Sequence, residues 1–409
     1  MRDDQDLAIK LKQNQQPVKA IYIASYIPRR CGIATFTKDL TTAINNLNPY
    51  TLAEIVAVND HGQNHPYPWE VKFRIGQHML PDYSSAAHYI NQSSAEVINL
   101  QHEFGLYGGV DGDYLLPLLD SIEKPLVTTF HTILPEPDDH KAYIMRRIIE
   151  RSDAVVAMSQ SSSQTLQDVY GCPSSKIALI YHGVPDFTFN DIERHKRHLR
   201  IKAQPMIMAA GLLGPGKGLE YVIDAMPDIV RAVPNAKLYI VGQTHPHIVR
   251  DSGEKYRESL VERVKKHHIS RSVVFVNRYL DDDDLRRYYM AADFFVTAYP
   301  NLQQPASGTL AYALGAGKVC IATPYHYARE ALSDDAGVLI EPRNSQAIAD
   351  AVINTVKDPK RAMHLRKKAY SKARQMTWPN IGSSYLDLFR QVIHKRRVNE
   401  QADISALAN

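Results

Sequence analysis

The stretch "GLLGPGK", residues 211–217, places one lysine behind a glycine-rich turn, and this combination can bind phosphate. The spacing is that of a Walker A loop, but the next residue is Gly218, where a magnesium-binding loop needs Ser or Thr. This departure disfavours an ATPase. Free backbone N–H groups at the start of the following helical pattern still suit a diphosphate. We therefore predict a phosphate site at Gly211, Gly216 and Lys217; the alternative is a tight turn with a surface lysine.

A second glycine turn, "SYIPRRCGIATFTKDL", lies at residues 25–40 between a predicted strand and a predicted helix. Gly32 permits close approach of a ligand to the backbone. The guanidinium groups of Arg29 and Arg30 could clamp an anion or a polyol. The alternative is a surface loop whose arginines are solvated.

Three further polar residues, His102, Glu103 and His131, follow two predicted strands. Isolated histidines are more often structural than catalytic, but convergence at strand ends favours a site. The spacing lacks a local His-x-x-His pattern, so we expect no metal. The acidic run "DDDDL", residues 281–285, is interpreted as the N-terminal cap of a helix rather than a cation site.

A polar loop and a helix start combine in "NLQQPASGTLAYALGAGKVCIATP", residues 301–324. The amides of Ser307, Gly308 and Thr309 would point into a cleft between two domains and form another anion site. The alternative is an ordinary strand-to-helix turn.

The elements that must position these residues are short apolar runs alternating with helical patterns, as in parallel sheets covered on both faces. The first set of expected strands is 20–26, 53–59, 96–101, 125–131, 154–159 and 177–183. The second set is 206–211, 237–242, 273–277, 294–299, 319–324 and 337–342. The helical patterns in the second set cover 218–232, 254–268, 283–292, 306–316 and 345–357. The predicted fold class is α/β, with two Rossmann-like doubly wound domains facing across a cleft.

Length and composition agree with two ordinary globular domains. The chain has 409 residues, 44% hydrophobic and 22% charged, and that length is about twice a usual domain. A net charge of +4 does not argue for nucleic acid. Three scattered cysteines disfavour disulfides and zinc. No signal sequence or apolar run of membrane-spanning length occurs, so we expect a cytoplasmic protein.

The expected join is the polar stretch "GVPDFTFNDIERHKRHLRIKAQ", residues 183–204. Its basic cluster "RHKRHLR" is interpreted as a solvated linker helix, with peripheral contact to an anionic membrane as the alternative. The expected domains are residues 1–190, together with a crossing helix at 379–400, and residues 200–378.

Taken together, these stretches resemble the retaining, nucleotide-sugar-dependent glycosyltransferases of family 4, which have the GT-B fold. The similarity covers about residues 18–395. It rests on the first glycine loop and, in order, on "TTFHT", "DAVVAMS", "IYHGVPD", "AAGLLGPGKGLEYVIDA", "LYIVG", "YLDDDDLRRYYMAADFFVTA" and "LAYALGAGKVCIATP".

The resemblance implies transfer of a hexose, mannose or glucose, from a nucleoside diphosphate to an acceptor hydroxyl, with no required metal or other cofactor. It implies a nucleotide-binding second domain and an acceptor-side first domain, whose acceptor-side residues would be Arg29, Arg30, His102 and Glu103. Gly32 would approach the donor phosphate or acceptor, His131 would bond the transferred sugar, and Lys217 would balance charge on the leaving diphosphate.

Three departures from the family pattern stand out. Leu212 occupies the place of the arginine in the Arg-x4-Lys pair. Gln303 and Ala311 occupy the two places of the Glu-x7-Glu motif. Arg278 stands where the family has a glycine in its nucleotide-side loop.

These departures leave three classes of function open. In a divergent transferase, Arg278 or the Arg29 and Arg30 pair would replace the missing charge, and Gln303 with the 307–309 turn would grip the donor. The alternatives are a non-catalytic sugar-binding or scaffold protein, and a phosphorylase or epimerase that uses phosphate or a sugar phosphate. We favour the transferase, because Lys217, the glycine turns and His131 persist.

Overall fold

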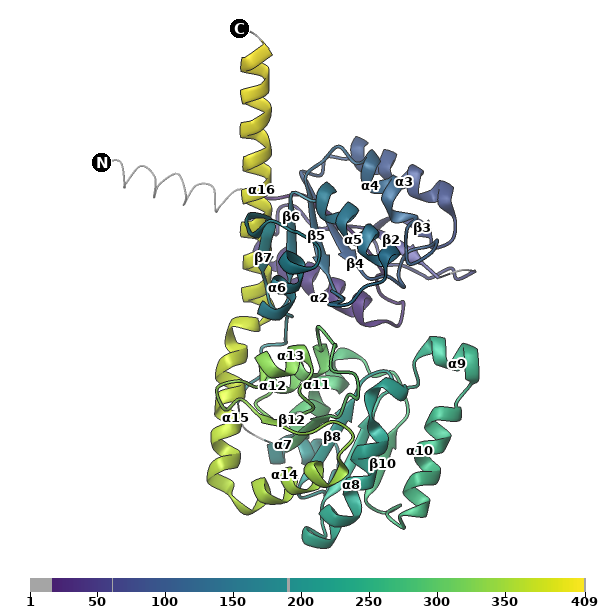
Figure 1. Ribbon diagram of the computed structural model, residues 1–409, viewed down its shortest axis with the longest axis vertical. Helices are drawn as coiled ribbons and strands as arrows, with labels where there is room; N and C mark the ends of the chain where they lie inside the picture. The colour runs from purple at the N-terminus through teal and green to yellow at the C-terminus, as the bar shows by residue number, and fades with distance from the viewer. Residues whose placement is uncertain (1–16, 61, 190–191, 408–409) are drawn as a thin grey trace, which may run out of the picture. The chain divides into compact units, whose positions relative to one another are not determined.

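The computed structural model describes residues 17–60, 62–189 and 192–407, and this part of the chain divides into two compact units. The first unit runs to Gly183 and resumes at Trp378, and the second unit spans Val184–Thr377 (Figure 1). Each unit has its own parallel sheet and its own hydrophobic core.

The first unit contains these elements in chain order. Its strands are β1 (Ala20–Ala24), β2 (Glu54–Asn59), β3 (Val71–Gly76), β4 (Val97–His102), β5 (Leu126–Phe130), β6 (Ala154–Ala157) and β7 (Ile177–Leu179). Its helices are α2 (Gly32–Leu47), α3 (Leu80–Gln92), α4 (Leu115–Ser121), α5 (Asp139–Arg151), α6 (Gln160–Asp168), the short 3-10 helix η1 (Ser174–Lys176) and α16 (Trp378–Leu407).

The second unit repeats the same alternation. Its strands are β8 (Met206–Ala210), β9 (Lys237–Val241), β10 (Val273–Val276), β11 (Phe294–Thr297), β12 (Val319–Ala322) and β13 (Val338–Leu339). Its helices are α7 (Ile192–His198), η2 (Pro215–Lys217), α8 (Leu219–Ala232), α9 (Pro246–Ser252), α10 (Lys255–Lys266), α11 (Asp282–Ala291), α12 (Gly308–Gly315), α13 (His326–Ala331), α14 (Ser345–Lys357), α15 (Pro359–Ala373) and η3 (Arg374–Met376).

Both sheets have the strand order of a dinucleotide-binding fold, which confirms the predicted class. The orders are β3-β2-β1-β4-β5-β6-β7 and β10-β9-β8-β11-β12-β13, with all neighbours parallel. In such sheets the second and third strands are added on one side of the first strand, and the fourth strand is added on its other side. Ligands bind beyond the carboxyl ends of the strands at this switch point. The two switch points are β1/β4 and β8/β11. All strands except β3 are predicted by the sequence pattern.

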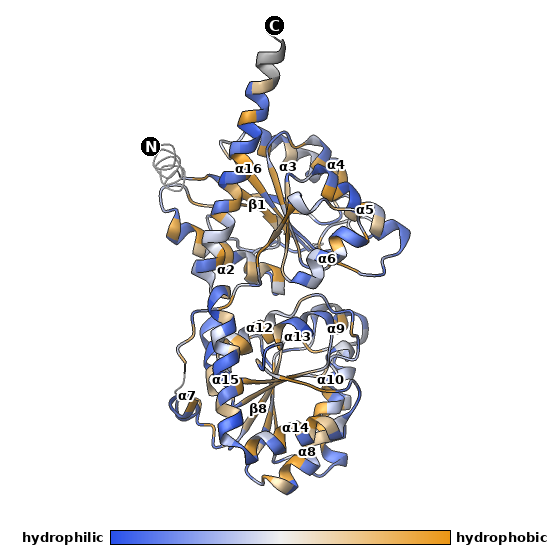
Figure 2. Cartoon of the chain, turned by 60° about the vertical axis from the view of Figure 1, so that its left-hand side comes forward, coloured by the Kyte–Doolittle hydropathy of each residue, from blue (hydrophilic) through white to orange (hydrophobic). Residues whose placement is uncertain are grey.

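Burial explains why the strands are continuous apolar runs. In β1, Ile21 and Ile23 pack into one core and Tyr22 packs into the other, so both faces of the sheet are covered. Helix α16 supplies Tyr385 and Phe389 to the second of these cores. Figure 2 shows the strands of both units in orange, enclosed by helices that carry blue residues. The expected C-terminal helix is therefore present, although it extends to Leu407.

The boundary between the units lies at Gly183 rather than in the expected range of 190–200. Val184 forms a parallel bridge with Thr377 and therefore belongs to the second unit. The ring of Phe187 also packs against aromatic rings of that unit.

The expected linker helix is present as α7, and Arg194, Arg197 and His198 are exposed, but one face of the helix packs on the second unit. Lys196 in this helix is only 3% exposed, and its Nζ lies 2.7 Å from Asp293 and 3.1 Å from Glu193. A buried and paired lysine is not available to an anionic surface, so this part of the basic cluster does not support membrane contact.

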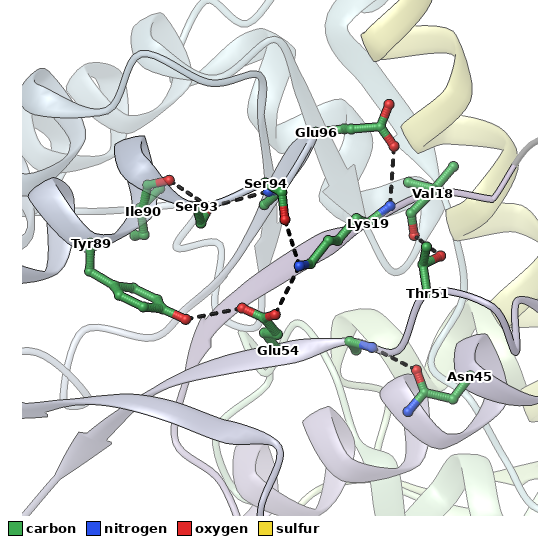
Figure 3. Close-up of polar contacts among 12 residues, drawn as sticks. Val18, Lys19, Asn45, Thr51, Glu54, Tyr89, Ile90, Ser93, Ser94 and Glu96 are labelled. Atoms are coloured by element: carbon green, nitrogen blue, oxygen red, sulfur yellow. Dashed lines mark hydrogen bonds and ion pairs between the residues drawn. The ribbon is translucent and has the colours of Figure 1, made fainter.

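The amino ends of β1, β2 and β4 are closed by a polar network (Figure 3). Lys19 Nζ donates to Ser94 Oγ at 2.7 Å and pairs with Glu54 at 3.1 Å. Glu96 accepts from the Lys19 amide at 3.3 Å and pairs with Arg397 of α16 at 2.7 Å. The network ties α16 to the sheet and lies at the end opposite the β1/β4 switch point.

Candidate functional site

Some of the predicted residues gather, together with residues that the sequence did not single out, into one group in each unit. We name the group formed by Gly211, Lys217, Tyr299, Ser307 and Thr309 the phosphate half-site. We name the group formed by Phe36, Gln101, His131, His182 and Trp378 the histidine half-site. Each belongs to one unit and is built by that unit alone.

Lys217 is the charged residue of the phosphate half-site. Its Nζ donates to the Tyr299 hydroxyl at 3.2 Å and lies 4.6 Å from the centre of that ring. The side chain is half-buried. Within the described ranges, no carboxylate lies at ion-pair distance from it. The ammonium therefore has one neutral partner and N–H donors left for an anion.

Tyr299 is a site residue that the sequence pattern did not single out. It follows β11 and stacks on Tyr325 with ring centres 5.0 Å apart. Burial pushes the pKa of Tyr299 upward, but the Lys217 charge and hydrogen bonds with Thr309 and Ser307 outweigh burial and lower that pKa. The hydroxyl is thus polarised toward the lysine. The sequence signal that could have identified Tyr299 is its position at the end of the predicted strand 294–299.

The start of α12 lies beside the glycine turn. Ser307 caps this helix by accepting from the Leu310 amide at 3.3 Å. Thr309 Oγ1 lies 3.2 Å from Ser307 Oγ and 3.4 Å from the Tyr299 hydroxyl. A Cβ on Gly211 would lie 3.4 Å from Thr309 Cγ2, so the turn and the helix start are in contact. Gly308 is the first residue of the helix.

The glycines of the turn differ in what they require. Gly218 has φ +62°, and a Cβ there would come within 2.0 Å of the Ala298 carbonyl oxygen. A Cβ on Gly216 would have no heavy atom of the described residues within 4 Å, so the backbone there is open to a ligand. Gly218 therefore fixes the turn against β11, while Gly216 leaves space in front of Lys217.

Two predicted donor-binding residues are not drawn into this group. Arg278 donates to Asp284 at 2.8 Å and is 60% exposed. Gln303 is half-buried, and its backbone N–H donates to Asn301 Oδ1 at 2.9 Å. No hydrogen bond or ion pair joins either residue to Lys217 in the part of the chain that the structure describes. Arg278 is thus occupied at the start of α11, where Asp281 forms the predicted cap.

The histidine half-site is organised around one phenylalanine of α2. The Phe36 ring meets those of His131, His182 and Trp378 at centroid distances of 4.8, 5.2 and 5.3 Å. All three contacts are edge-to-face, an arrangement that aromatic rings favour. Phe36 therefore connects β5, the segment after β7 and the start of α16.

The protonation of His131 follows from a chain of amides behind it. The Asn99 amide nitrogen donates to the Val127 carbonyl at 3.0 Å, so the Asn99 oxygen must face Gln101. That oxygen accepts from Gln101 Nε2, which turns the Gln101 oxygen toward His131. His131 Nε2 lies 2.7 Å from this oxygen and must carry the proton. Nδ1 of the neutral ring is then an acceptor.

Both histidines of this half-site are neutral. Burial, with a smaller contribution from His182 and His102, lowers the pKa of His131 to about 3. Burial lowers the pKa of His182 to about 4, although its Nδ1 lies 2.8 Å from the Gly183 carbonyl. A neutral imidazole can hydrogen-bond a sugar hydroxyl without adding positive charge to the site.

The glycine loop after β1 only partly matches the expected clamp. Gly32 is exposed, and no described heavy atom lies within 4 Å of the place a Cβ would take, so a ligand can approach its backbone. Arg29, however, is 7% exposed and donates to the Val58 carbonyl at 3.0 Å and to Asp60 at 2.6 Å. Its charge stabilises the loop, and the expectation for Arg29 is revised accordingly. Arg30 is exposed.

His102 and Glu103 have different surroundings. His102 is 1% exposed among Phe104, Tyr107 and Phe130, and its Nδ1 has no hydrogen-bond partner among the described residues. Burial lowers the pKa of His102 to about 3. The expectation that it faces an acceptor is therefore corrected: it is a core histidine. Glu103 is half-buried, accepts from Thr132 Oγ1 at 2.7 Å, and its pKa is raised by burial.

Two further properties of the described residues concern metals and membranes. No group of three or more His, Cys, Asp or Glu side chains there could hold a metal ion. No helix within the described ranges has the length and apolar character needed to span a bilayer.

Known protein families match both units. The family described as "Glycosyltransferase Family 4" matches residues 43–186, and "Glycosyl transferases group 1" matches residues 191–372. Among relatives, the alpha-monoglucosyldiacylglycerol synthase of Streptococcus pneumoniae is 23% identical over 90% of this chain and 85% of that protein. An uncharacterized glycosyltransferase, MJ1607 of Methanocaldococcus jannaschii, is 26% identical over 62% of this chain and 64% of its own.

Solved structures give the same architecture. The Anabaena protein Alr3699/HepE, in complex with UDP and glucose, superposes with a TM-score of 0.72 at 15% identity, over 91% of this chain and all of that one. Sucrose-phosphate synthase of Thermosynechococcus elongatus gives 0.76 at 18% identity, over 92% of this chain and all of that one. Two parallel-sheet Rossmann-like units of this kind define the GT-B class. The chain is a family 4-like glycosyltransferase with the GT-B fold, and the names of its relatives support a hexosyltransferase.

Proposed function

We propose that this protein is a retaining transferase that moves a hexose from a nucleoside diphosphate sugar to an acceptor hydroxyl. The observation that carries the proposal is Lys217. Among the described residues it is a cation without a carboxylate partner, placed beyond the β8/β11 switch point beside the start of α12. Such a place suits the diphosphate of a donor, because backbone N–H groups and an ammonium meet there.

The proposed chemistry follows from where charge develops. Negative charge accumulates on the diphosphate as the bond to the sugar breaks, and the Lys217 ammonium stabilises that charge. Backbone amides at Gly216 and at the start of α12 are placed to help. No metal is required in this proposal. His131, with its acceptor Nδ1, is assigned to a hydroxyl of the transferred sugar on the strength of the family resemblance.

The departures from the family pattern limit how the nucleotide is held. Ala311 is fully buried, so no side chain at that position can grip a ribose. Gln303 keeps an amide that can bond a sugar hydroxyl. The contacts to the ribose must come from other residues. We therefore propose that this protein binds the ribose of its donor differently from the family pattern.

The choice of hexose rests on relatives. The S. pneumoniae relative is named for a glucosyl product, and a relative of Agrobacterium fabrum, 26% identical over 59% of this chain and 54% of its own, is named mannosylfructose-phosphate synthase. Glucose or mannose is therefore the proposed sugar. The proposed setting is the cytoplasm, in keeping with free thiols at Cys31, Cys172 and Cys320.

The test is binding followed by product analysis. Thermal unfolding is measured with GDP, UDP, ADP, GDP-mannose, UDP-glucose, mannose 1-phosphate and phosphate, since a ligand at 100 times its Kd stabilises the native state by about 2.7 kcal/mol. We expect one nucleotide and its sugar conjugate to stabilise the protein, and Lys217→Ala to abolish the effect. The anomeric configuration of the first product, read by proton NMR, then tests retention.

Other outcomes would replace the proposal. Stabilisation by mannose 1-phosphate but by no nucleotide, lost in Lys217→Ala, would favour a phosphorylase-like enzyme. If neither nucleotides nor sugar nucleotides stabilise the protein and none is consumed, a non-catalytic sugar-binding role would be favoured. An inverted product anomer would leave transfer intact but contradict retention.

A further inference from the structure

Glu103 is a carboxylate without a cationic partner at the β1/β4 switch point of the first unit. It follows β4 directly, at the end of the sheet where ligands bind in this fold. Its Oε2 accepts from Thr132 Oγ1 at 2.7 Å, and its Oε1 accepts from the Phe104 amide at 3.1 Å. No lysine or arginine of the described residues lies at ion-pair distance from it. Because a carboxylate has about four lone-pair sites, both oxygens can accept further hydrogen bonds.

The groups beside Glu103 also suit hydroxyl groups. The His131 amide donates to the His102 carbonyl at 3.0 Å, which continues the pairing of β4 with β5 and places Glu103 beside His131. His131 is neutral and has Nδ1 as an acceptor, and Thr132 carries a hydroxyl of its own. Glu103, His131 and Thr132 are all half-buried, so each retains accessible surface. Together they offer hydrogen-bond acceptors and a hydroxyl, and none of them is a cation.

Two of the cations at this end of the first sheet are neutralised by aspartates. Arg29, in the loop after β1, is 7% exposed and lies 2.6 Å from Asp60. Lys141, in the first turn of α5, lies 3.3 Å from Asp111. Arg30 is exposed. The charges of Arg29 and Lys141 are therefore already balanced before any ligand binds.

Carboxylates outnumber cations at the same end of the sheet. The comparison covers, within the first unit, the segments between each strand end and the first turn of the next helix, with Asp60 for the connection after β2. The described carboxylates there are Asp60, Asp82, Glu103, Asp111, Asp113, Glu136, Asp138 and Asp139, and the described Lys and Arg residues are Arg29, Arg30 and Lys141. Eight carboxylates and three cations give a negative potential, which disfavours an anionic ligand.

We infer that the acceptor is an uncharged polyol rather than a phosphorylated one, and that Glu103 accepts hydrogen bonds from its hydroxyl groups. The inference rests on the proposed function, because it names the acceptor class of the same transfer. A hydroxyl group donates to a carboxylate in a charge-assisted hydrogen bond. A phosphate group carries the same sign of charge as Glu103 and the surrounding carboxylates, which therefore repel it. Glu103 is thus a residue that determines acceptor specificity.

A panel of matched acceptors tests the class. The full-length protein is supplied with the sugar nucleotide that stabilises it and with glucose, mannose or myo-inositol, or with glucose 6-phosphate, mannose 6-phosphate or myo-inositol 3-phosphate. Mass spectrometry and initial rates measure the transfer. We expect at least one uncharged member to be used, with a kcat/KM about tenfold or more above that of its phosphorylated counterpart, because like charges repel the latter. A preference for the phosphorylated counterpart would overturn the inference.

Two glutamate variants then test whether Glu103 sets this preference. Glu103→Gln keeps the size of the side chain and removes its charge, so we expect the KM for the uncharged acceptor to rise about tenfold. The KM for the sugar nucleotide should change by less than about twofold, and the discrimination against the phosphorylated acceptor should decrease. Glu123→Gln removes the same charge from an exposed position before β5, at the opposite end of the sheet, and should leave all three values at the wild-type level. An unchanged acceptor KM in Glu103→Gln would remove Glu103 from the acceptor site.

Failure of the inference and failure of the proposed function give different results. Hydrolysis of the sugar nucleotide without transfer to any uncharged member of the panel would overturn the inference and leave the proposed donor intact. If no sugar nucleotide is consumed, the proposed function itself is contradicted, and the inference fails with it. Thermal unfolding shows whether Glu103→Gln is folded, and the panel with the wild-type protein decides the acceptor class in either case.

Discussion

Lys217 combines the three properties that a diphosphate-binding residue needs. It is held at a defined place by the Tyr299 hydroxyl, it faces a turn with open backbone at Gly216, and no carboxylate of the described residues neutralises it. Leu212, which replaces the arginine of the family pattern, leaves Lys217 as the cation of the turn. Its contribution to turnover should therefore be large.

We expect Lys217→Ala to lower turnover by a factor of about 10² or more, because the charge that stabilises the leaving diphosphate is removed. Stability should change little, since the side chain is half-buried and its hydrogen bond is to a neutral partner. Turnover of the preferred sugar nucleotide and thermal unfolding are the measurements. A folded variant with wild-type turnover would remove Lys217 from the mechanism.

His102 gives a prediction about pH and stability. Its pKa is about 3 in the folded protein because burial disfavours the cation, whereas an unfolded histidine has a pKa of about 6.5. At pH values between these two pKa values, His102 therefore binds fewer protons in the folded state than in the unfolded state. The contribution to stability is complete above about pH 6.5 and is lost as pH falls toward 3, by up to about 1.4 kcal/mol per pH unit. His131 and His182 act in the same direction.

The variant His102→Phe keeps a ring among the surrounding aromatic side chains and removes the titrating group. Between about pH 7 and about pH 5, its free energy of unfolding should fall by about 2 kcal/mol less than that of the wild type. Urea denaturation at several pH values measures this difference. His88→Phe, at an exposed position on α3, is the control. Parallel pH profiles for wild type and His102→Phe would contradict the buried neutral state.

At the scale of single elements, the glycine turn between β8 and α8 is set by one backbone contact. Gly218 has a positive φ, and any Cβ there would collide with the Ala298 carbonyl oxygen at 2.0 Å. Gly216, two residues earlier, has open space around it. The two glycines therefore differ in structural need although both belong to the predicted motif.

We expect Gly218→Ala to destabilise the protein by about 2 kcal/mol or more, because a strained φ and a backbone clash act together. Gly216→Ala should change the free energy of unfolding by less than about 0.5 kcal/mol, as surface substitutions do. Chemical denaturation of the two variants tests the contrast. Equal destabilisation would mean that the position of Gly218 against β11 is not what fixes the turn.

The sequence predicts elements better than it predicts partners. Buried parallel strands such as β6 form continuous apolar runs, and such runs are visible without a structure. β3 was missed because it lies at the sheet edge and its first four residues alternate between half-buried and exposed. Arg29 was expected to bind an anion, since nothing in the local pattern reveals that Asp60, far along the chain, neutralises it. Tyr299 ends a predicted strand, but its contact with Lys217, 82 residues away in the chain, cannot be read from the local pattern.

At the scale of the whole chain, the two units differ in continuity. The second unit is one uninterrupted stretch, and the core cluster around Ile207 and Leu238 consists, among the described residues, of side chains from this unit. The first unit is built from two stretches, because α16 supplies Trp378, Tyr385 and Phe389 to the core around Tyr22. Tyr385 also hydrogen-bonds Thr129 of β5 at 2.9 Å. The first sheet is therefore incompletely covered until the end of the chain is present.

This difference predicts how fragments behave. Residues 184–377 alone should fold and melt in one cooperative transition, because core and sheet are complete. Residues 17–183 alone should not, since an apolar face normally covered by α16 would be exposed to water. Circular dichroism and thermal melting of both fragments measure this directly.

The matched control is a fragment in which residues 17–183 continue through a short Gly/Ser linker into residues 378–407. Gly183 and Trp378 are close enough for this, since a Cβ on Gly183 would lie 2.2 Å from the Trp378 ring. The linked fragment should regain a cooperative melt, because the linker restores α16 to the core. If residues 17–183 alone melt as cooperatively as the linked fragment, α16 is an appendage to a self-sufficient fold. If the linked fragment also fails to fold, the first unit requires more of the chain than its own two stretches.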